Sequence, residues 1–347
     1  MVLRPGRKTT IMRSFYAAQS GKMIHPLQLG NLSLPSNLIQ APLAGVSCAP
    51  FRELIAEFAG VAYCATEMIS AKTLLHRPLR RYTYKSPREG LLSFQLSGNQ
   101  VLELQKAAEL ACGYGADLID LNCGCPVAKI RKKGCGSKLL SLSTTLAQII
   151  QGIKSITTAP LSVKIRVDGD SGDRFNTDVV KAVNDAGADF LIVHGRHWTE
   201  HYDTAVRLDE IASIVHHSAI PVIGNGDVKD YPSLQKMFTT TGCAGIMIGR
   251  AGVGQPWLFQ MLSAQDQGQT YCKPSTAEIG QLFLKHIQGL VELDNEIIAT
   301  LQARKLSKYY FRAAGLPANL QAEFQYLPHF NALREWIGSA FLSNQNR

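Results

Sequence analysis

The chain has 347 residues, 46% of them hydrophobic, and a formal net charge of +9. This composition indicates a globular protein with a sizeable core, built as one large domain with an appendage or as two medium domains. No apolar run is long enough to span a membrane and no signal-peptide core is present, which argues against membrane and secreted classes. Eight scattered cysteines lack the density of a disulfide-stapled fold, so we expect a cytoplasmic protein.

Residues 1–23 are rich in basic side chains and contain no acidic one. We expect this segment to be a disordered tail. A mitochondrial targeting segment is one alternative. Translation from Met12 or Met23 is the other.

From about residue 38, short apolar runs alternate with longer amphipathic segments. The predicted strands are Leu38–Pro42, Val61–Thr66, Leu91–Leu96, Asp117–Asn122, Leu161–Arg166, Phe190–His194, Pro221–Gly224 and Gly245–Ile248. The predicted helices are Pro50–Ala59, Gln100–Tyr114, Ser143–Ile156, Asp178–Ala186, Leu208–His216 and Ser233–Thr240. The connection between the second and third strands does not read as a clear helix.

This alternation is typical of β-α units around a parallel sheet. Eight such strands predict an α/β fold of the (β/α)8 TIM-barrel type, which we place at residues 24–265. A doubly wound open sheet is the alternative. It is disfavoured because no G-x-G-x-x-G sequence follows the first strand.

Residues 264–274 are polar and contain a proline, which is typical of a linker. Beyond it, Ala277–Leu293, Ile297–Ala313 and Leu320–Leu342 have helical spacing without intervening strands, and we predict a small all-helical domain over residues 275–347. The second of these helices mixes charged and aromatic residues: Arg304, Lys305, Lys308, Tyr309, Tyr310, Phe311 and Arg312. Such a face can bind nucleic acid, or the aromatics can be core and the charges solvated.

The residues that end the predicted strands are unusually polar. In a barrel, groups at the carboxyl ends of the strands form the active site. The polar strand ends are Glu67, Gln95, Asn122, Lys164, Arg166, His194, Arg196, Asn225, Asp227 and Arg250. One of them alone could be an ordinary rim residue, but together they predict a site for a large polar ligand.

The last two strand ends resemble a phosphate site. Asn225-Gly226-Asp227 and Gly249-Arg250 place glycine-rich backbone where barrels commonly hold a phosphate. Lys164 points into the predicted barrel mouth, where an unpaired lysine would be costly without an anion. A flavin, with a phosphate at one end and a ring that gains negative charge on reduction, would satisfy both features.

Cys125 follows the fourth strand in the turn Asn122-Cys123-Gly124-Cys125-Pro126. Glycine allows a sharp turn there and proline ends the strand, so the turn presents a thiol at the site. A thiol can act as general acid in flavin-dependent reduction of a conjugated C=C bond. Cys123 and Cys135 are expected to be structural, and no metal is expected because the spacing is not that of a zinc site.

Seven motifs resemble those of the tRNA-dihydrouridine synthases. They are Ala41-Pro-Leu-Ala-Gly45, Phe94-Gln-Leu-Ser-Gly98, Asp120-Leu-Asn-Cys-Gly-Cys-Pro126, Val163-Lys-Ile-Arg166, Val193-His-Gly-Arg196, Pro221-Val-Ile-Gly-Asn-Gly-Asp227 and Met247-Ile-Gly-Arg-Ala251. The resemblance runs in order from about residue 24 to the end of the chain. It implies an FMN-bearing barrel followed by a helical tRNA-binding domain, and NADPH as the reductant of the flavin.

The resemblance also implies roles for individual residues. Cys125 would protonate uracil C5 while flavin N5 delivers hydride to C6. The cofactor would be held by Pro42, Leu43, Ala44, Gln95, Lys164, His194, Asn225, Gly226, Asp227, Gly249 and Arg250. The substrate would be held by Asn122, Arg166, Lys129, Lys132, Arg304, Lys305 and Lys308. The target uridine would be unstacked into the barrel mouth, with tRNA recognised by shape and phosphates.

Within the family, Cys125-Pro-Val-Ala-Lys-Ile-Arg131 and Gly249-Arg-Ala-Gly-Val-Gly-Gln-Pro-Trp257 are most similar to the bacterial B-type branch, which acts at position 17 of the D-loop. The chain departs from the family pattern at Ser47-Cys48 and at His197-Trp198, where an Asp and a Thr-Arg pair are usual. Two alternatives stay open on the residues alone. One is an FMN barrel that acts on a free pyrimidine, and the other is a non-catalytic tRNA-binding factor.

Overall fold

The computed structural model describes residues 22–170, 172 and 175–342. The predicted tail, residues 1–23, therefore lies outside the described residues except for its last two positions. Over the part of the chain that is described, no helix is long and apolar enough to cross a membrane.

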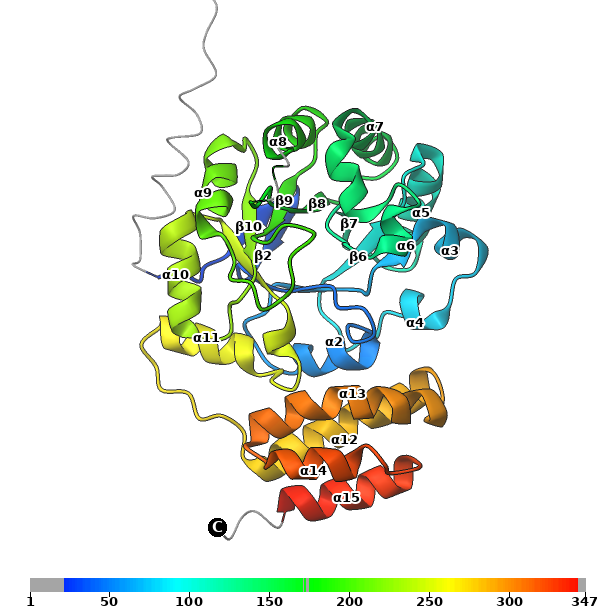
Figure 1. Ribbon diagram of the computed structural model, residues 1–347, viewed down its shortest axis with the longest axis vertical. Coiled ribbons are helices and arrows are strands. Elements are labelled where there is room, and N and C mark those ends of the chain that lie inside the picture. Colours follow the sequence, from blue (N-terminus) through cyan, green and yellow to red (C-terminus); the bar gives the residue numbers. More distant parts are fainter. Residues whose placement is uncertain (1–21, 171, 173–174, 343–347) are drawn as a thin grey trace, which may run out of the picture.

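Eight parallel strands among the described residues close into a barrel, which confirms the predicted fold class (Figure 1). They are β3 (Leu38–Gln40), β4 (Tyr63–Ala65), β6 (Leu92–Ser97), β7 (Leu118–Asn122), β8 (Leu161–Arg166), β9 (Phe190–His194), β10 (Val222–Asn225) and β11 (Gly245–Ile248). The ring closes through parallel pairing of β11 with β3 and of β4 with β6. Each was predicted at this place in the chain, with ends that differ by up to two residues.

A two-stranded hairpin that was not predicted precedes the barrel. Its strands are β1 (Leu27–Leu29) and β2 (Leu32–Leu34), paired antiparallel. The turn contains Gly30 with a φ of 59°, a left-handed conformation that glycine adopts without strain. Hairpin leucines share a core cluster with residues from inside the barrel, including Phe190 and Ile192. The alternation of leucines around Gly30-Asn31 was the sequence signal for this hairpin.

Helices surround the barrel. They are α2 (Ala49–Ala56), α3 (Ala71–His76), α4 (Arg80–Thr83), α5 (Val101–Gly113), α6 (Ala128–Arg131), α7 (Ser143–Lys154), α8 (Asn176–Asp185), α9 (Leu208–His217), α10 (Tyr231–Thr241) and α11 (Leu258–Asp266). All of them except the short α4 and α6 bury apolar side chains. The connection between β4 and β6, which showed no clear helical pattern, contains the short helices α3 and α4 and the two-residue strand β5 (Ile69–Ser70).

Beyond the barrel the chain forms α12 (Thr276–Leu293), α13 (Glu296–Ala314), α14 (Ala318–Phe324) and α15 (Phe330–Leu342). The prediction of one helix over Leu320–Leu342 was wrong, because α14 ends at Phe324 and a separate helix follows. Pro328 disfavours helical backbone at the residue before it, and the next helix begins only at Phe330. The predicted linker also starts too early, since α11 continues to Asp266.

The aromatic residues of α13 belong to the core of this helical segment. Tyr310 is fully buried and stacks on Phe283 of α12 with ring centroids 4.4 Å apart. Phe311 stacks on Trp336 of α15 at 5.4 Å. Of the two interpretations of this helix, burial in the core is therefore correct for these aromatics.

The helical segment packs against the barrel beside α2 (Figure 1). His286 of α12 lies 5.9 Å from the ring of Phe51, and its Nδ1 is 2.9 Å from the hydroxyl of Tyr310. Burial lowers the pKa of His286 to about 3, assisted by the positive charge of Arg81. The imidazole at this interface is therefore neutral at physiological pH.

His286 should make stability depend on pH. Its pKa is 6.5 in an unfolded chain and about 3 when folded, so only the unfolded chain binds a proton between these values. The free energy of unfolding should thus fall as pH drops below 6.5, with this residue contributing up to about 1.4 kcal/mol per pH unit. His286→Gln should flatten that dependence in denaturant titrations from pH 7 to pH 5. His216→Gln, at an exposed position on α9, should retain the wild-type dependence.

Candidate active site

A cavity of about 1080 Å³ opens at the carboxyl ends of the barrel strands. Many residues predicted to act together line it: Pro42, Leu43, Ala44, Gln95, Asn122, Cys125, Lys164, Arg166, His194, Asn225, Gly226, Asp227, Gly249, Arg250 and Lys308. Four predicted substrate residues lie outside this lining: Lys129, Lys132, Arg304 and Lys305. The structure thus brings residues from many loops to one concave surface.

The turn that carries Cys125 is held by side-chain hydrogen bonds. Asn122 Oδ1 accepts from the backbone N–H of Cys125 at 2.9 Å and of Gly124 at 3.3 Å. Arg166 Nε donates to the carbonyl of Gly124 at 2.8 Å. Cys125 is half-buried on the cavity wall, whereas the neighbouring Cys123 is fully buried in the core. Only one of these two thiols therefore faces the cavity.

Asn122 is itself oriented by a chain of polar groups across three strands. Its Nδ2 donates to Gln95 Oε1 at 2.8 Å, and Gln95 Nε2 donates to Asp120 Oδ2 at 2.6 Å. The other Asp120 oxygen accepts from the Ser162 hydroxyl at 2.7 Å. Burial raises the pKa of Asp120 to about 6, opposed by these hydrogen bonds and by Lys164. Sequence reasoning did not predict Asp120 as a site residue. A carboxylate inside a buried strand is rare, and that rarity was an available sign of a special role.

Lys164 lies in the barrel mouth as predicted. Its ammonium donates to Asn225 Oδ1 at 2.7 Å, and Asn225 Nδ2 donates to the carbonyl of Met247 at 2.8 Å. Burial lowers the pKa of Lys164 to about 7, an effect that Asp120 opposes and Arg166 reinforces. A further anion in the cavity would favour the charged form of this amine.

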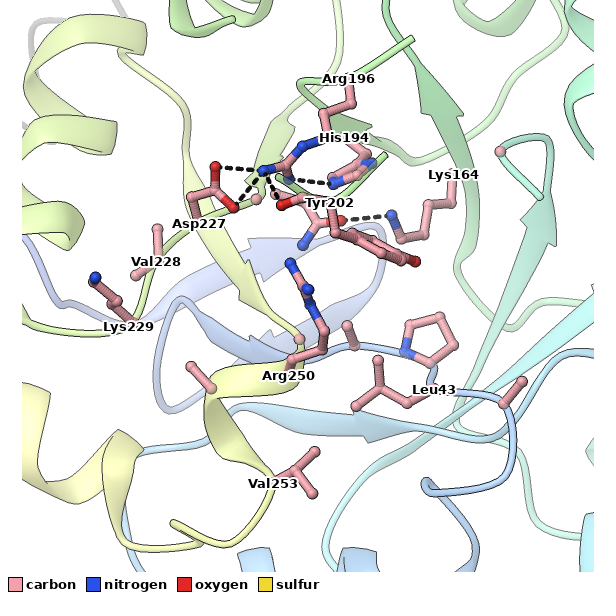
Figure 2. Close-up of a pocket in the computed structure, with 18 of the residues that line it drawn as sticks. Leu43, Lys164, His194, Arg196, Tyr202, Asp227, Val228, Lys229, Arg250 and Val253 are labelled. Carbon is pink, nitrogen blue, oxygen red and sulfur yellow. Dashed lines mark hydrogen bonds and ion pairs between the residues drawn. The ribbon is translucent and has the colours of Figure 1, made fainter. Parts of the chain in front are cut away.

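Arg196 organises the end of β9, where Figure 2 shows its guanidinium between His194 and Asp227. It donates to both carboxylate oxygens of Asp227, at 2.7 and 2.6 Å. Asp227 has a φ of 54°, a left-handed conformation uncommon for a non-glycine residue. Burial holds the pKa of His194 well below its usual range, reinforced by cations that include Lys164, Arg166 and Arg196. His194 is therefore a neutral imidazole in an electropositive setting.

Tyr202 and Arg250 meet above this group of side chains. The Arg250 guanidinium lies 4.1 Å from the centroid of the Tyr202 ring, and both residues line the cavity (Figure 2). The loop that carries Tyr202 is fastened by Arg196, which donates to the carbonyls of Tyr202 and Thr204. Arg196 was named among the polar strand ends but was given no individual role. Tyr202 was not predicted, because a tyrosine within a loop carries no local signal of function.

The first loop of the cavity, Pro42–Gly45, is anchored from outside. The Ser47 hydroxyl accepts from the backbone N–H of Leu43 at 2.9 Å. Glu67 Oε2 accepts from the backbone N–H of Gly45 at 2.6 Å. Ser47, one of the two departures from the family pattern, thus supplies an anchor for this loop.

The second departure, His197-Trp198, contacts the basic loop that follows Cys125. The Arg131 guanidinium lies 3.1 Å from the centroid of the Trp198 ring, and Arg131 also donates to the Ser137 hydroxyl at 3.3 Å. Lys129 and Lys132 of the same loop are exposed. The loop therefore presents exposed lysines near the cavity, while Arg131 packs on an aromatic ring.

Helix α13 reaches the rim of the cavity through Lys308, Tyr309 and Arg312. Close packing allows this, since a Cβ on Gly254 would lie 2.7 Å from the backbone of Tyr309. Arg304 is placed differently, because its guanidinium donates to the carbonyl of Leu327 at 2.8 Å. Tyr309 and Arg312 were not assigned to the site. The available signal for Arg312 was its position four residues after Lys308, which places both side chains on one face of a helix.

The family model described as "Dihydrouridine synthase (Dus)" matches residues 39–338. The chain belongs to the dihydrouridine synthase family. It is 31% identical over 290 residues to tRNA-dihydrouridine synthase B of Vibrio parahaemolyticus, covering 82% of this chain and 89% of that protein. It is 34% identical over 287 residues to the probable tRNA-dihydrouridine synthase 1 of Synechocystis, covering 82% and 81%. As a member of this family the protein is a flavin-dependent oxidoreductase.

The barrel also resembles solved structures of other proteins. A variant of NCR from Zymomonas mobilis superposes with a TM-score of 0.54 at 15% identity, covering 71% of this chain and 92% of that one. At this identity the likeness concerns the fold alone.

The cavity residues fit a flavin. Pro42, Leu43 and Ala44 offer a largely apolar wall, and Gln95 and Lys164 are hydrogen-bond donors beside it. The cations that lower the pKa of His194 make the part of the cavity around this residue suitable for a phosphate. Among the described residues no group of three or more His, Cys, Asp or Glu side chains could hold a metal ion.

Gly136 supports the Cys125 turn and should not tolerate a side chain. Its φ is 61°, and an added Cβ would lie 2.7 Å from the Cys125 carbonyl oxygen. Gly136→Ala should lower the free energy of unfolding by about 1–3 kcal/mol in denaturant titrations, because the backbone is strained and the turn must shift. Gly124→Ala is the matched control, since its Cβ would meet the nearest atom at 3.5 Å. Equal stability losses in the two variants would contradict this assignment.

Proposed function

We propose that this protein reduces the C5=C6 bond of a uridine in the D-loop of tRNA to 5,6-dihydrouridine, with FMN as cofactor and NADPH as reductant. The observation that carries the proposal is that Cys125 shares one cavity with the residues that fit the flavin. The family membership and the names of the relatives agree with it. Bound FMN supplies the hydride for uracil C6.

Cys125 is the proton donor in this proposal. Reduction of a C=C bond adds a hydride to one carbon and a proton to the other, so a group at the cavity wall must supply the proton. Asn122 and Arg166 fix the turn on both sides of Gly124, which keeps the thiol at one place on the wall. Asp120 and Gln95 hold Asn122 in turn.

FMN is proposed to lie along the cavity from the Pro42–Ala44 loop to the ends of β10 and β11. Gln95 and Lys164 would bond the polar edge of its ring, while His194, Asn225, Gly226, Gly249 and Arg250 would hold the ribityl chain and phosphate. Asp227 acts through Arg196, because its carboxylate is engaged by that guanidinium. The cationic side chains of the cavity, including Lys164 and Arg196, are held in position by other protein groups before FMN binds. Binding therefore requires little rearrangement of the protein.

The substrate is proposed to reach the cavity as an unstacked nucleotide of an intact tRNA. Lys308 and Arg312 of α13 make the cavity rim basic, and the loop after β7 adds the exposed Lys129 and Lys132 outside the lining. These chains can neutralise phosphates of the RNA backbone. Arg304 and Lys305 lie further along α13, where Lys305 is exposed and Arg304 also fastens Leu327.

Replacing Cys125 tests the proton donor. Cys125→Ala should slow dihydrouridine formation by about 10²–10⁴-fold, because the C5 proton must then come from water. FMN content and reduction of the bound flavin by NADPH should stay near wild type, as measured by absorbance. Cys135→Ala is the control, since that thiol lies on the same loop without lining the cavity. Full turnover by Cys125→Ala would refute the assignment, and activity on free uridine without tRNA would refute the substrate.

Replacing the basic residues of α13 tests the RNA contact. Lys308→Ala and Arg312→Ala should each weaken tRNA binding and lower the slope of log affinity against log salt by about one. The measurement is a filter-binding titration at several salt concentrations. Lys181→Ala is the control, since that exposed lysine on α8 is paired with Asp185. An unchanged salt slope in both α13 variants would show that this helix does not bind the RNA backbone.

A further inference from the structure

A buried group of charged side chains connects the first cavity loop to the helical segment. It consists of Glu67, which follows β4, Arg81 of α4, and Asp294, which ends α12. Their side chains are only 7%, 13% and 13% exposed. Charges at this depth are costly unless each has a partner, so their arrangement constrains the parts of the chain that carry them.

The contacts run without a gap from the cavity wall outward. Glu67 Oε2 accepts from the backbone N–H of Gly45 at 2.6 Å, directly after the cavity residues Pro42–Ala44. Glu67 Oε1 is 2.7 Å from an Nη of Arg81. The other Nη of Arg81 is 2.5 Å from Asp294.

The outer end of this group is fixed to both long helices of the helical segment. Gln302 of α13 accepts from Arg81 at 3.2 Å and donates to Asp294 at 3.3 Å. The neighbouring Arg80 donates to the carbonyl of Glu292 near the end of α12. Arginine suits this position because its planar guanidinium can bond two carboxylates and an amide at once.

We propose that Arg81 is a positioning residue for the active site. Through Glu67 it sets the place of the Pro42–Gly45 loop, and through Asp294 it makes that place depend on how α12 and α13 dock on the barrel. This inference rests on one part of the proposed function, namely that FMN binds against the Pro42–Gly45 loop. A purely structural ion cluster would stabilise the chain without affecting the cofactor.

The test measures FMN binding to the full-length apoprotein by quenching of flavin fluorescence. Asp294→Asn removes the ion pair between Arg81 and the helical segment. It leaves the Glu67–Arg81 pair in place and alters no residue of the cavity. It should weaken FMN binding by about three- to tenfold. Lys285→Gln is the matched control, because the exposed Lys285–Glu57 pair also joins the helical segment to the barrel but ends on α2. It should bind FMN within twofold of wild type.

The free energy of unfolding is measured for both variants, so that stability and cofactor affinity are separated. Wild-type FMN affinity in a folded Asp294→Asn variant would overturn the proposal, as would an equal loss in Lys285→Gln. Should Asp294→Asn fail to fold, Arg81→Lys serves instead, since lysine lacks the two separate Nη groups with which Arg81 contacts Glu67 and Asp294. It should weaken FMN binding similarly. A wild-type protein that binds no FMN would instead refute the proposed cofactor.

Discussion

Closure of the barrel is the constraint on which the rest of this structure depends. Parallel strands in a ring send their carboxyl ends to one rim, so the groups that end β7, β8, β9, β10 and β11 must meet. In this chain the meeting groups include Lys164, Arg166, Arg196 and Arg250. Burial of His194 and the positive charges of these side chains depress the pKa of its imidazole, and the same charges repel one another across the cavity. An anionic ligand relieves that cost, which is a physical reason for a phosphate-bearing cofactor here.

Order at the site comes from polar groups that bond one another across strands. The series Ser162, Asp120, Gln95 and Asn122 spans β8, β7 and β6, and its last member holds the backbone of Cys125. Each member is buried, so a missing partner would leave an unsatisfied group in a medium of low polarity. The thiol is therefore placed by a buried polar network in which Gln95 and Asn122 line the cavity, while Asp120 and Ser162 lie behind them.

The helical segment contributes residues to the rim of the cavity. Lys308, Tyr309 and Arg312 of α13 form part of the cavity rim, and the close approach at Gly254 makes this possible. The aromatic core formed by Phe283, Tyr310 and Phe311 gives the segment its rigidity. The surface proposed for the RNA and the site proposed for one nucleotide thus adjoin.

Much of the architecture could be predicted from local pattern alone. Each barrel strand is a short apolar run, and hydrophobic period and run length are properties of neighbouring residues. The break after Phe324 was missed because the effect of Pro328 was outweighed by a continuing apolar period. The hairpin at Leu27–Leu34 was missed because its strands are only three residues long.

The sequence by itself determined the barrel, the strand-end residues and the position of Cys125 in its turn, since all three follow from spacing along the chain. Only the tertiary structure decided which side chains contact one another. The pairing of Asp227 with Arg196, the packing of Tyr202 on Arg250 and the link from Glu67 through Arg81 to Asp294 join residues from different loops and helices. Such contacts depend on how elements pack in space, and a single sequence carries no local signal of that packing.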